Sequence, residues 1–321
     1  MRPILLLLLL IAASPAPGFA QAFETTGARA LGMGGAFVAV ADDVSATWWN
    51  PAGLATGPFV SLIVEGARFD TDRQGAFGLP QPSERGSFFL GAASLPLGLT
   101  YVRTTEAYAA SGPADEAIVR ALTTHQVGAT VVQSLSDTIV VAATLKYVRG
   151  IAVSGPLGAG QSPGDAAADL DGDGANAFDA DIGLLATAGR LKAGVTVRNA
   201  LSPSFETRSG ARLELPWRAR AGVSYLVSEA LLMAVDVDLR AVETQGEKSR
   251  NLAIGAEWGI AGSTRFAVRA GARVDTVGDS RPLGTVGASY AVRNGIWVDV
   301  WAADGAETAD RGWGVAGRIV Y

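Results

Sequence analysis

The sequence has 321 residues, a formal net charge of −5 and no cysteine. The acidic balance and the lack of a basic run argue against a nucleic-acid partner, because neutralising phosphates requires a basic face. The missing cysteines exclude disulfides, thiol nucleophiles and cysteine-based metal sites. After the N-terminus, no apolar stretch reaches the roughly 20 residues of a transmembrane helix. With 40 glycines and only 18% charged residues, the chain is expected to be a soluble β-protein or a membrane barrel.

Residues 1–22 are predicted to be a secretory signal peptide. Arg2 supplies a positive start, residues 4–13 are uniformly apolar, and small residues at 20 and 22 offer a cleavage site. The apolar run is too short to span a bilayer and is followed by Pro15 and Pro17. We therefore expect an exported protein whose mature chain begins near Phe23.

Residues 27–43 form a glycine-rich run, GARALGMGGAFVAVADD, and residues 45–55 read SATWWNPAGLA. This opening resembles that of FadL-like outer-membrane proteins and of the related PorV/PorQ and TraF-like groups. In those proteins a glycine-rich stretch leads to an acidic pair and an NPAGLA signature. The resemblance is close here and looser over the remaining chain. It implies a barrel in the outer membrane of a Gram-negative-type bacterium, with residues 23–57 as a luminal hatch and residues 58–321 as the barrel.

The residue types in the hatch suggest how it would fold. Glycines permit close contact with the barrel wall, and Asp42 or Asp43 can cap a short helix that runs through Trp48. Asn50 and Pro51 are expected to end that helix, either shaping a turn only or also acting in transport. The candidate hatch residues are Gly34, Gly35, Asp42, Asp43, Trp48, Asn50, Pro51 and Gly53.

From about residue 59, apolar and polar residues alternate with a period of two, which indicates β-strands. The segment 191–198, for example, places Leu, Ala, Val and Val in one phase and Lys, Gly, Thr and Arg in the other. The same alternation recurs at 231–240 and 265–275. A soluble antiparallel sheet alternates in the same way, so this pattern alone does not identify a membrane barrel.

The lengths of the connections favour the barrel, because bacterial outer-membrane barrels pair short turns with longer external loops. Long connections are expected at 71–84, 108–118, 151–176, 200–214, 243–248, 276–282 and 304–309. Short turns are expected at 96–98, 134–137, 189–190, 228–230, 261–263 and 293–295. We therefore predict an all-β fold, a single antiparallel transmembrane β-barrel of about 14 strands with a short N-terminal luminal hatch.

A barrel of this width has a lumen that wall side chains alone do not fill. Charged residues of the inward phase should pair across this lumen. They would either hold the hatch to the wall, which is the favoured reading, or present arginines to an anionic headgroup. The candidate lumen charges are Arg218, Arg220, Asp236, Asp238, Arg269 and Arg273, with further inward charges at Arg240, Arg265, Asp299 and Arg318.

An acidic loop suggests a metal site. Asp169, Asp171 and Asp173, within residues 165–181, match the first half of a calcium loop. The second half departs from the pattern, with Ala180 at the position of the expected glutamate. The site is either a calcium site or a solvated external loop.

The remaining features concern the outer surface and the C-terminus. His125 shares the apolar phase of its strand, so it is expected near the membrane interface, and no enzymatic activity is expected. Tyr321 ends a strand that resembles the terminal strand recognised by the barrel-assembly machinery. Aromatic residues expected in interface girdles are Trp217, Tyr225, Trp258, Tyr290 and Trp301.

The resemblance implies passive uptake of small hydrophobic or amphipathic compounds, as in long-chain fatty-acid transporters. A ligand would enter from the external loops, occupy an apolar pocket above the hatch and leave past the displaced N-terminal segment. The alternative is a PorV-like secretion partner, or a scaffold barrel, that holds exported proteins at the cell surface. Expected partners are outer-membrane lipid, the barrel-assembly machinery, and either a hydrophobic small molecule or exported proteins.

Overall fold

The computed structural model describes residues 23–74, 80–112, 116–244, 247–260, 265–277, 281–305 and 311–321. The predicted signal peptide and the predicted turn at 261–263 lie outside the described residues. In the described part of the chain, no helix has the length and apolar character needed to cross a membrane.

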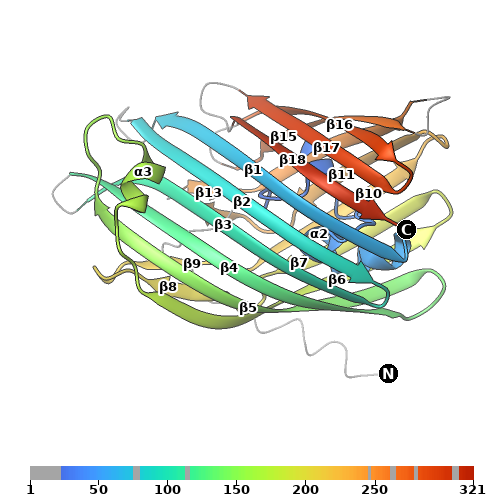
Figure 1. The fold of residues 1–321 in the computed structure, drawn as a ribbon, viewed down its shortest axis with the longest axis horizontal. Helices are drawn as coiled ribbons and strands as arrows, with labels where there is room; N and C mark the ends of the chain where they lie inside the picture. The colour runs from blue at the N-terminus through green and yellow to red at the C-terminus, as the bar shows by residue number, and fades with distance from the viewer. Residues whose placement is uncertain are drawn as a thin grey trace.

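Fourteen antiparallel strands close into a single barrel, which confirms the predicted fold class. The barrel strands are β1 (Val60–Gln74), β2 (Pro80–Ser94), β3 (Leu97–Ser111), β4 (Ala117–Ser134), β5 (Ile139–Pro156), β6 (Gly174–Ala188), β7 (Leu191–Arg198), β10 (Arg218–Leu226), β11 (Leu231–Asp238), β14 (Asn251–Gly259), β15 (Phe266–Asp275), β16 (Leu283–Arg293), β17 (Ile296–Gly305) and β18 (Arg311–Val320). Strands adjacent in this order pair in space, and β18 closes the barrel on β1, from Ser61 opposite Val320 to Asp70 opposite Arg311 (Figure 1).

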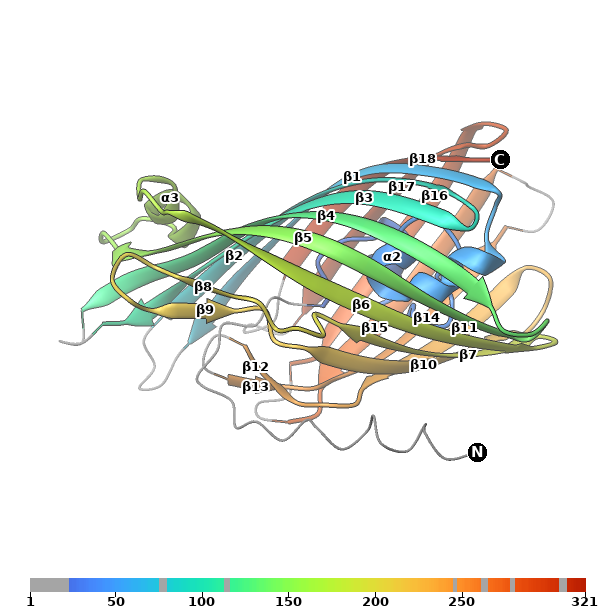
Figure 2. The same ribbon diagram turned by 90° about the horizontal axis from the view of Figure 1, so that it is seen from below.

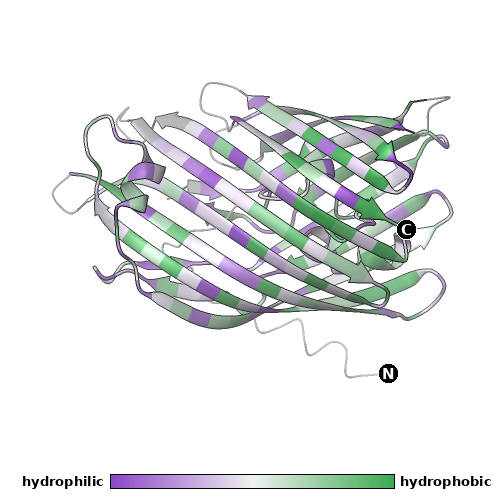
Figure 3. Ribbon diagram, viewed as in Figure 1, coloured by the Kyte–Doolittle hydropathy of each residue, from purple (hydrophilic) through white to green (hydrophobic). Residues whose placement is uncertain are grey.

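The period-two alternation of the sequence becomes the inside and the outside of this barrel. Along β5, Ala143, Leu145 and Tyr147 face outward and are exposed, while Thr144 and Lys146 face inward and are buried. Figure 3 shows the resulting alternation of hydrophobic and hydrophilic residues along the strands. Exposed apolar side chains over so much of a surface are what a lipid environment requires.

Four short helical elements and two small hairpins complete the part of the chain that the structure describes. The helical elements are α1 (Ala28–Gly32), α2 (Ala46–Trp49), the 3-10 helix η2 (Pro51–Thr56) and α3 (Pro163–Ala168). The hairpins are β8 (Ser204–Glu206) with β9 (Arg212–Glu214), and β12 (Val242–Thr244) with β13 (Glu247–Ser249). The α1, α2 and η2 elements lie inside the barrel, whereas α3 lies outside it (Figure 2).

The strands run further into the long connections than predicted. β5 reaches Pro156 and β3 reaches Ser111, where loops were expected from residues 151 and 108. The reason is that both faces of these extensions are covered. The outward residues Ala107, Val119 and Val153 are buried together with Ala166 of α3, and on the luminal side Phe205 and Leu213 of the β8–β9 hairpin join a buried cluster with Leu122.

The depth of the outward residues can be tested by placing a charge at two heights. Leu145 is 68% exposed near the middle of the apolar outer face, whereas Gln133 lies beside a short turn. Leu145→Arg is expected to lower the free energy of unfolding in lipid vesicles by about 2–4 kcal/mol, and Gln133→Arg by about 0–1 kcal/mol. Denaturant titration in vesicles measures both values, and equal losses would contradict this placement of the bilayer.

Candidate functional site

The N-terminal segment, residues 23–56, fills the lumen near the end of the barrel that carries the short connections. α1 contacts β15, β16, β17 and β18, while η2 contacts β4, β5 and β6 on the other side. The segment has an aromatic centre in which the ring of Trp49 lies 5.2 Å from that of Phe23 and 6.0 Å from that of Phe37. Because almost every residue of the segment is buried, it forms the core of the molecule.

Two carboxylates of the barrel wall hold the backbone of this segment. Glu65 on β1 accepts hydrogen bonds from the amides of Gly27 and Ala28, at 2.6 and 2.7 Å. Asp236 on β11 accepts hydrogen bonds from the amides of Phe37 and Val38, both at 2.8 Å. All of these groups are buried, so each bond satisfies a donor that would otherwise be costly to bury.

Arg220 on β10 joins the start of the segment to the wall. Its guanidinium lies 2.5 Å from Glu24 and 2.6 Å from Asp238, and it stacks over the ring of Phe23 at 4.2 Å. Arg273 lies 3.7 Å from the other oxygen of Glu24. The predicted lumen charges therefore pair with neighbouring strands and with the segment. Arg220 and Arg273 thus connect the wall to Glu24 of the segment, which occupies the lumen.

A second network surrounds Arg29 of α1. Its guanidinium lies 2.5 Å from Asp42, 2.9 Å from Asp43 and 3.2 Å from Glu257 on β14. Arg269 lies 2.5 Å from the same Glu257. The network continues through Asp299 to Arg318, whose Nε lies 3.0 Å from that carboxylate.

Asp42 and Asp43 do not cap α2 as predicted. The residue that precedes α2 is Ser45, which makes no side-chain cap. Asp43 accepts hydrogen bonds from the amide and the hydroxyl of Ser45, and so orders the turn before the helix. Asp42 instead pairs with Arg29, because that buried guanidinium requires negative partners.

The glycines and Asn50 lie where the segment meets the wall. Gly34 has a φ of +70°, and a Cβ there would lie 2.8 Å from the backbone N and O of Ala272 on β15. Gly35 also has a positive φ, and a Cβ on Gly53 would clash with Ala41 O. Asn50 donates to Val38 O at 2.9 Å and to Leu184 O of β6 at 3.1 Å.

Asn50 and Pro51 also determine the local chain path. α2 ends at Trp49, and the Asn50 side chain accepts a bond from the amide of Ala52 at the start of η2. The helix therefore ends where predicted, but the chain passes into a 3-10 helix and not directly toward β1. Trp48 donates to Phe23 O, and the guanidinium of Arg198 lies 3.4 Å from the centre of its ring.

Sequence reasoning missed Glu24, Glu65 and Glu257. For Glu65 a signal was present, because between residues 61 and 69 it is the one charged residue in an inward phase that otherwise reads Ser61, Ile63, Ala67 and Phe69. Trp301 was misplaced, since it faces the lumen beside Phe69 and does not belong to a membrane girdle. It shares its phase with the inward Asp299, and that phase identifies its direction.

The lumen nearer the long connections holds a separate apolar cluster. Its buried members are Tyr108, Leu122, Val148, Ala152, Phe205, Leu213 and Leu215. A layer of charges lies between this cluster and the N-terminal segment, in which Lys146 lies 2.8 Å from Asp179 and 2.6 Å from Asp181.

The predicted calcium loop and His125 lie away from the lumen centre. Asp173 pairs with Arg208 at 3.1 Å, and this arginine lowers the pKa of the carboxyl. Among the described residues no three Asp, Glu or His side chains are grouped so as to hold a metal ion. Calcium binding stays a prediction. The ring of His125 lies on the outer face, with its Nδ1 2.8 Å from the Tyr101 hydroxyl.

Removing the Arg220 side chain tests how firmly the segment is attached. Arg220→Met leaves Glu24 and Asp238 buried without their main partner, so the free energy of unfolding should fall by about 3–5 kcal/mol. Adding Glu24→Gln should restore part of the loss, because the two groups are coupled. Arg311→Gln removes an exposed pair with Asp304 and should cost less than about 1 kcal/mol. Equal losses for the two arginines would refute the attachment.

The pH dependence of the attachment follows from Glu24. Burial raises its pKa, but the charges of Arg220 and Arg273 outweigh burial and lower the pKa from 4.5 to about 2. The ionised carboxylate therefore stabilises the folded state above pH 4.5, and this contribution is lost as the pH falls through about 2. Protease accessibility of residues 23–56 should increase only as the pH falls from 4.5 to about 2. Glu24→Gln should remove this increase. Release at neutral pH would contradict the assignment.

The fold is shared with solved membrane barrels. The CymD monoaromatic hydrocarbon channel superposes with a TM-score of 0.66 at 13% identity, over 92% of this chain and 98% of the channel. The Ralstonia pickettii toluene transporter TbuX superposes with a TM-score of 0.62 at 14% identity, over 93% of this chain and 99% of the transporter. A Pseudomonas aeruginosa FadL homologue superposes with a TM-score of 0.61 at 12% identity, over 94% of this chain and 99% of the homologue. These superpositions show a common fold at low sequence identity, as the resemblance of the N-terminal run implied.

Sequence comparison adds a family assignment. No curated protein matches the chain. The family described as "F plasmid transfer operon, TraF, protein" matches residues 65–238, from β1 to the end of β11. Because this match spans more than half of the 321 residues, the chain belongs to that TraF family.

Proposed function

We propose that this protein is an outer-membrane barrel for the passive uptake of small hydrophobic or amphipathic compounds. The observation that carries the proposal is a lumen filled by an N-terminal segment at one end and lined by an apolar cluster at the other. Proteins with the same fold are described as a monoaromatic hydrocarbon channel and a toluene transporter. The end with the longer connections would face the cell exterior.

The entry side would be the apolar cluster beneath the β8–β9 hairpin. Phe205 and Leu213 of this hairpin are buried against Leu122 and Val148 of the wall. An apolar ligand that displaced the hairpin would exchange one apolar contact for another, at small net cost. The hairpin therefore supports a lid role, with the ligand held above the charged layer of Lys146.

The exit side depends on which part of the segment can move. Displacing the whole segment would break several buried ion pairs, each costing about 3–5 kcal/mol when one partner is lost. Its last part is held more weakly. Residues 55–58 are partly exposed, and Thr56 contacts the wall through a bond from Lys192 at 3.1 Å. A local shift of η2 next to β4, β5 and β6 is thus a less costly exit than ejection of the hatch.

A reversible crosslink can test this movement, because the chain contains no cysteine. A Cβ on Gly98 of β3 would lie 3.1 Å from Leu54 Cδ1 of η2, so cysteines at these two positions would have adjoining side chains that oxidation can join. Oxidised Gly98→Cys/Leu54→Cys holds η2 to the wall and should slow uptake of labelled fatty acid or toluene into liposomes toward the protein-free rate. Reduction should restore it.

The two single-cysteine variants are the matched controls, and both should transport equally with or without oxidant. Uptake that is the same in the oxidised and reduced double variant would contradict segment movement. Absence of uptake by the parent protein would contradict the transport function itself.

The second candidate is a scaffold or secretion partner that holds exported proteins at the cell surface. The buried ion pairs around Arg29 and Arg220 favour a permanently closed barrel. The description of the TraF family also refers to a plasmid transfer operon. Co-purification of exported proteins with a parent barrel that lacks uptake would support this role over transport.

A further inference from the structure

Three basic side chains lie side by side on the outer face of the barrel. Arg103 of β3 is directly opposite His125 of β4, and His125 is directly opposite Arg149 of β5. The outward phases of these three strands contain no aspartate or glutamate along their whole described length. The two arginines therefore place positive charge on either side of His125 with no carboxylate beside it on these strands, which is an arrangement that an anion would stabilise.

The two arginines have no partner in the described part of the protein. Arg103 and Arg149 are both exposed, and neither guanidinium makes a hydrogen bond or an ion pair with any described residue. An arginine elsewhere in the barrel provides the contrast. Arg311 lies in a similar position, on the outer face two residues from the exposed Trp313 in the direction of the long connections. Unlike Arg103 and Arg149, it lies opposite Asp70 and pairs with Asp304 at 3.1 Å.

The row lies at the depth of a lipid headgroup. Two residues nearer the membrane centre, the same strands carry the outward rings of Tyr101 and Tyr147, and Tyr147 lies 5.8 Å from Phe178 of β6. Such outward aromatic rings mark the membrane interface. On the other side of the row, toward the long connections, α3 covers Val119 and its neighbours, as expected for a surface that has left the bilayer.

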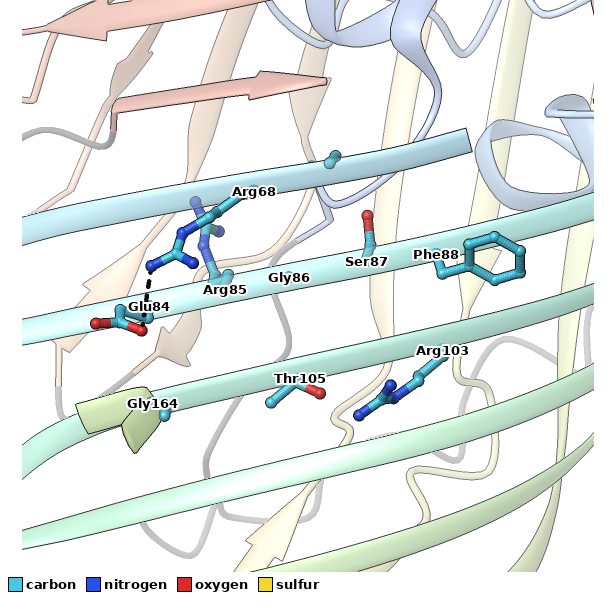
Figure 4. A pocket seen from close by; sticks show the side chains of 11 residues that line it. Arg68, Glu84, Arg85, Gly86, Ser87, Phe88, Arg103, Thr105 and Gly164 are labelled. Carbon is cyan, nitrogen blue, oxygen red and sulfur yellow. Dashed lines mark ion pairs between the residues drawn. The ribbon is translucent and has the colours of Figure 1, made fainter. Parts of the chain in front are cut away.

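A hollow of about 360 Å³ extends from this row beneath α3. Figure 4 shows Arg103 and Thr105 on one side of it, Arg68 and Glu84 on the other, and Gly164 of α3 at its edge. Arg68 is already neutralised, by Asp70 at 3.1 Å and Glu84 at 3.6 Å. The third arginine of the lining, Arg85, is buried and lies 4.6 Å from the centre of the Phe69 ring. Arg103 is therefore the exposed positive group in this hollow that an external anion would meet.

We propose that Arg103, His125 and Arg149 bind the phosphate of an anionic lipid in the leaflet on the side of the long connections. Guanidinium groups bind phosphate through paired, charge-assisted hydrogen bonds. The hollow beneath α3 receives the adjoining part of the headgroup, and the acyl chains lie along the apolar outer face below Tyr101 and Tyr147. This site lies outside the lumen, so it does not depend on the transport function.

Native mass spectrometry of the detergent-purified protein tests the site with three probes. Phosphatidic acid carries the phosphate on acyl chains, diacylglycerol has the same chains without it, and inorganic phosphate is the free anion. Phosphatidic acid should bind, while diacylglycerol and inorganic phosphate at the same concentration should not. Arg103→Gln/Arg149→Gln should weaken binding about 30-fold, because each arginine near an anionic membrane surface strengthens binding about fivefold.

Two further variants separate charge from folding. Arg103→Lys/Arg149→Lys keeps the charges and should retain most of the binding, whereas Arg311→Gln removes an arginine that already has acidic partners and should leave binding unchanged. Heat-modifiable migration on a gel reports whether each variant is folded. Undiminished binding in the folded double glutamine variant, equal binding of diacylglycerol, or displacement of lipid by an equal concentration of phosphate would overturn the proposal.

Discussion

A polar lumen enclosed by hydrocarbon is the constraint on which this structure depends. Charges that face inward cannot reach lipid and, once the lumen is filled, cannot reach bulk water, so each one requires a partner. The wall supplies carboxylates to backbone amides through Glu65 and Asp236, and arginines to carboxylates through Arg220 and Arg269. The N-terminal segment is therefore part of the folded core, and its sequence and the inward phase of the barrel have to match each other.

The predictable part of the fold is the part governed by a repeating pattern. Alternation with a period of two, together with alternating connection lengths, was sufficient for the closed fourteen-strand barrel. Glu24 carries no such pattern, because it lies outside every strand and its partners Arg220 and Arg273 are nearly 200 residues or more distant in sequence. The identity of the inward charges was predictable, but their pairing was not, since pairing depends on how the segment folds inside the lumen.

The strand ends were less predictable because one strand passes from lipid into a region that is covered by protein. Where β3, β4 and β5 leave the bilayer, their outward residues must be covered by protein, and α3 provides that cover. The sequence does not distinguish residues such as Ala107 and Val119 from lipid-facing ones, because an apolar side chain has the same pattern under a helix as in a membrane. A short helix and short hairpins within the long connections have too few residues to show a period of their own.

The outer face carries information about orientation that is independent of connection length. Near the short connections, the outward rings of Phe266 and Tyr290 stack at 4.9 Å, which marks one interface. Near the long connections, Tyr101 and Tyr147 mark the other, and there a row of arginine and histidine without acidic partners among the described residues follows the rings. Arg311 shows that this barrel can balance an outward arginine with acidic neighbours. Because the chain compensates one position and leaves the other open, the two positions face different surroundings, and an anionic headgroup is the surrounding that makes the open position stable.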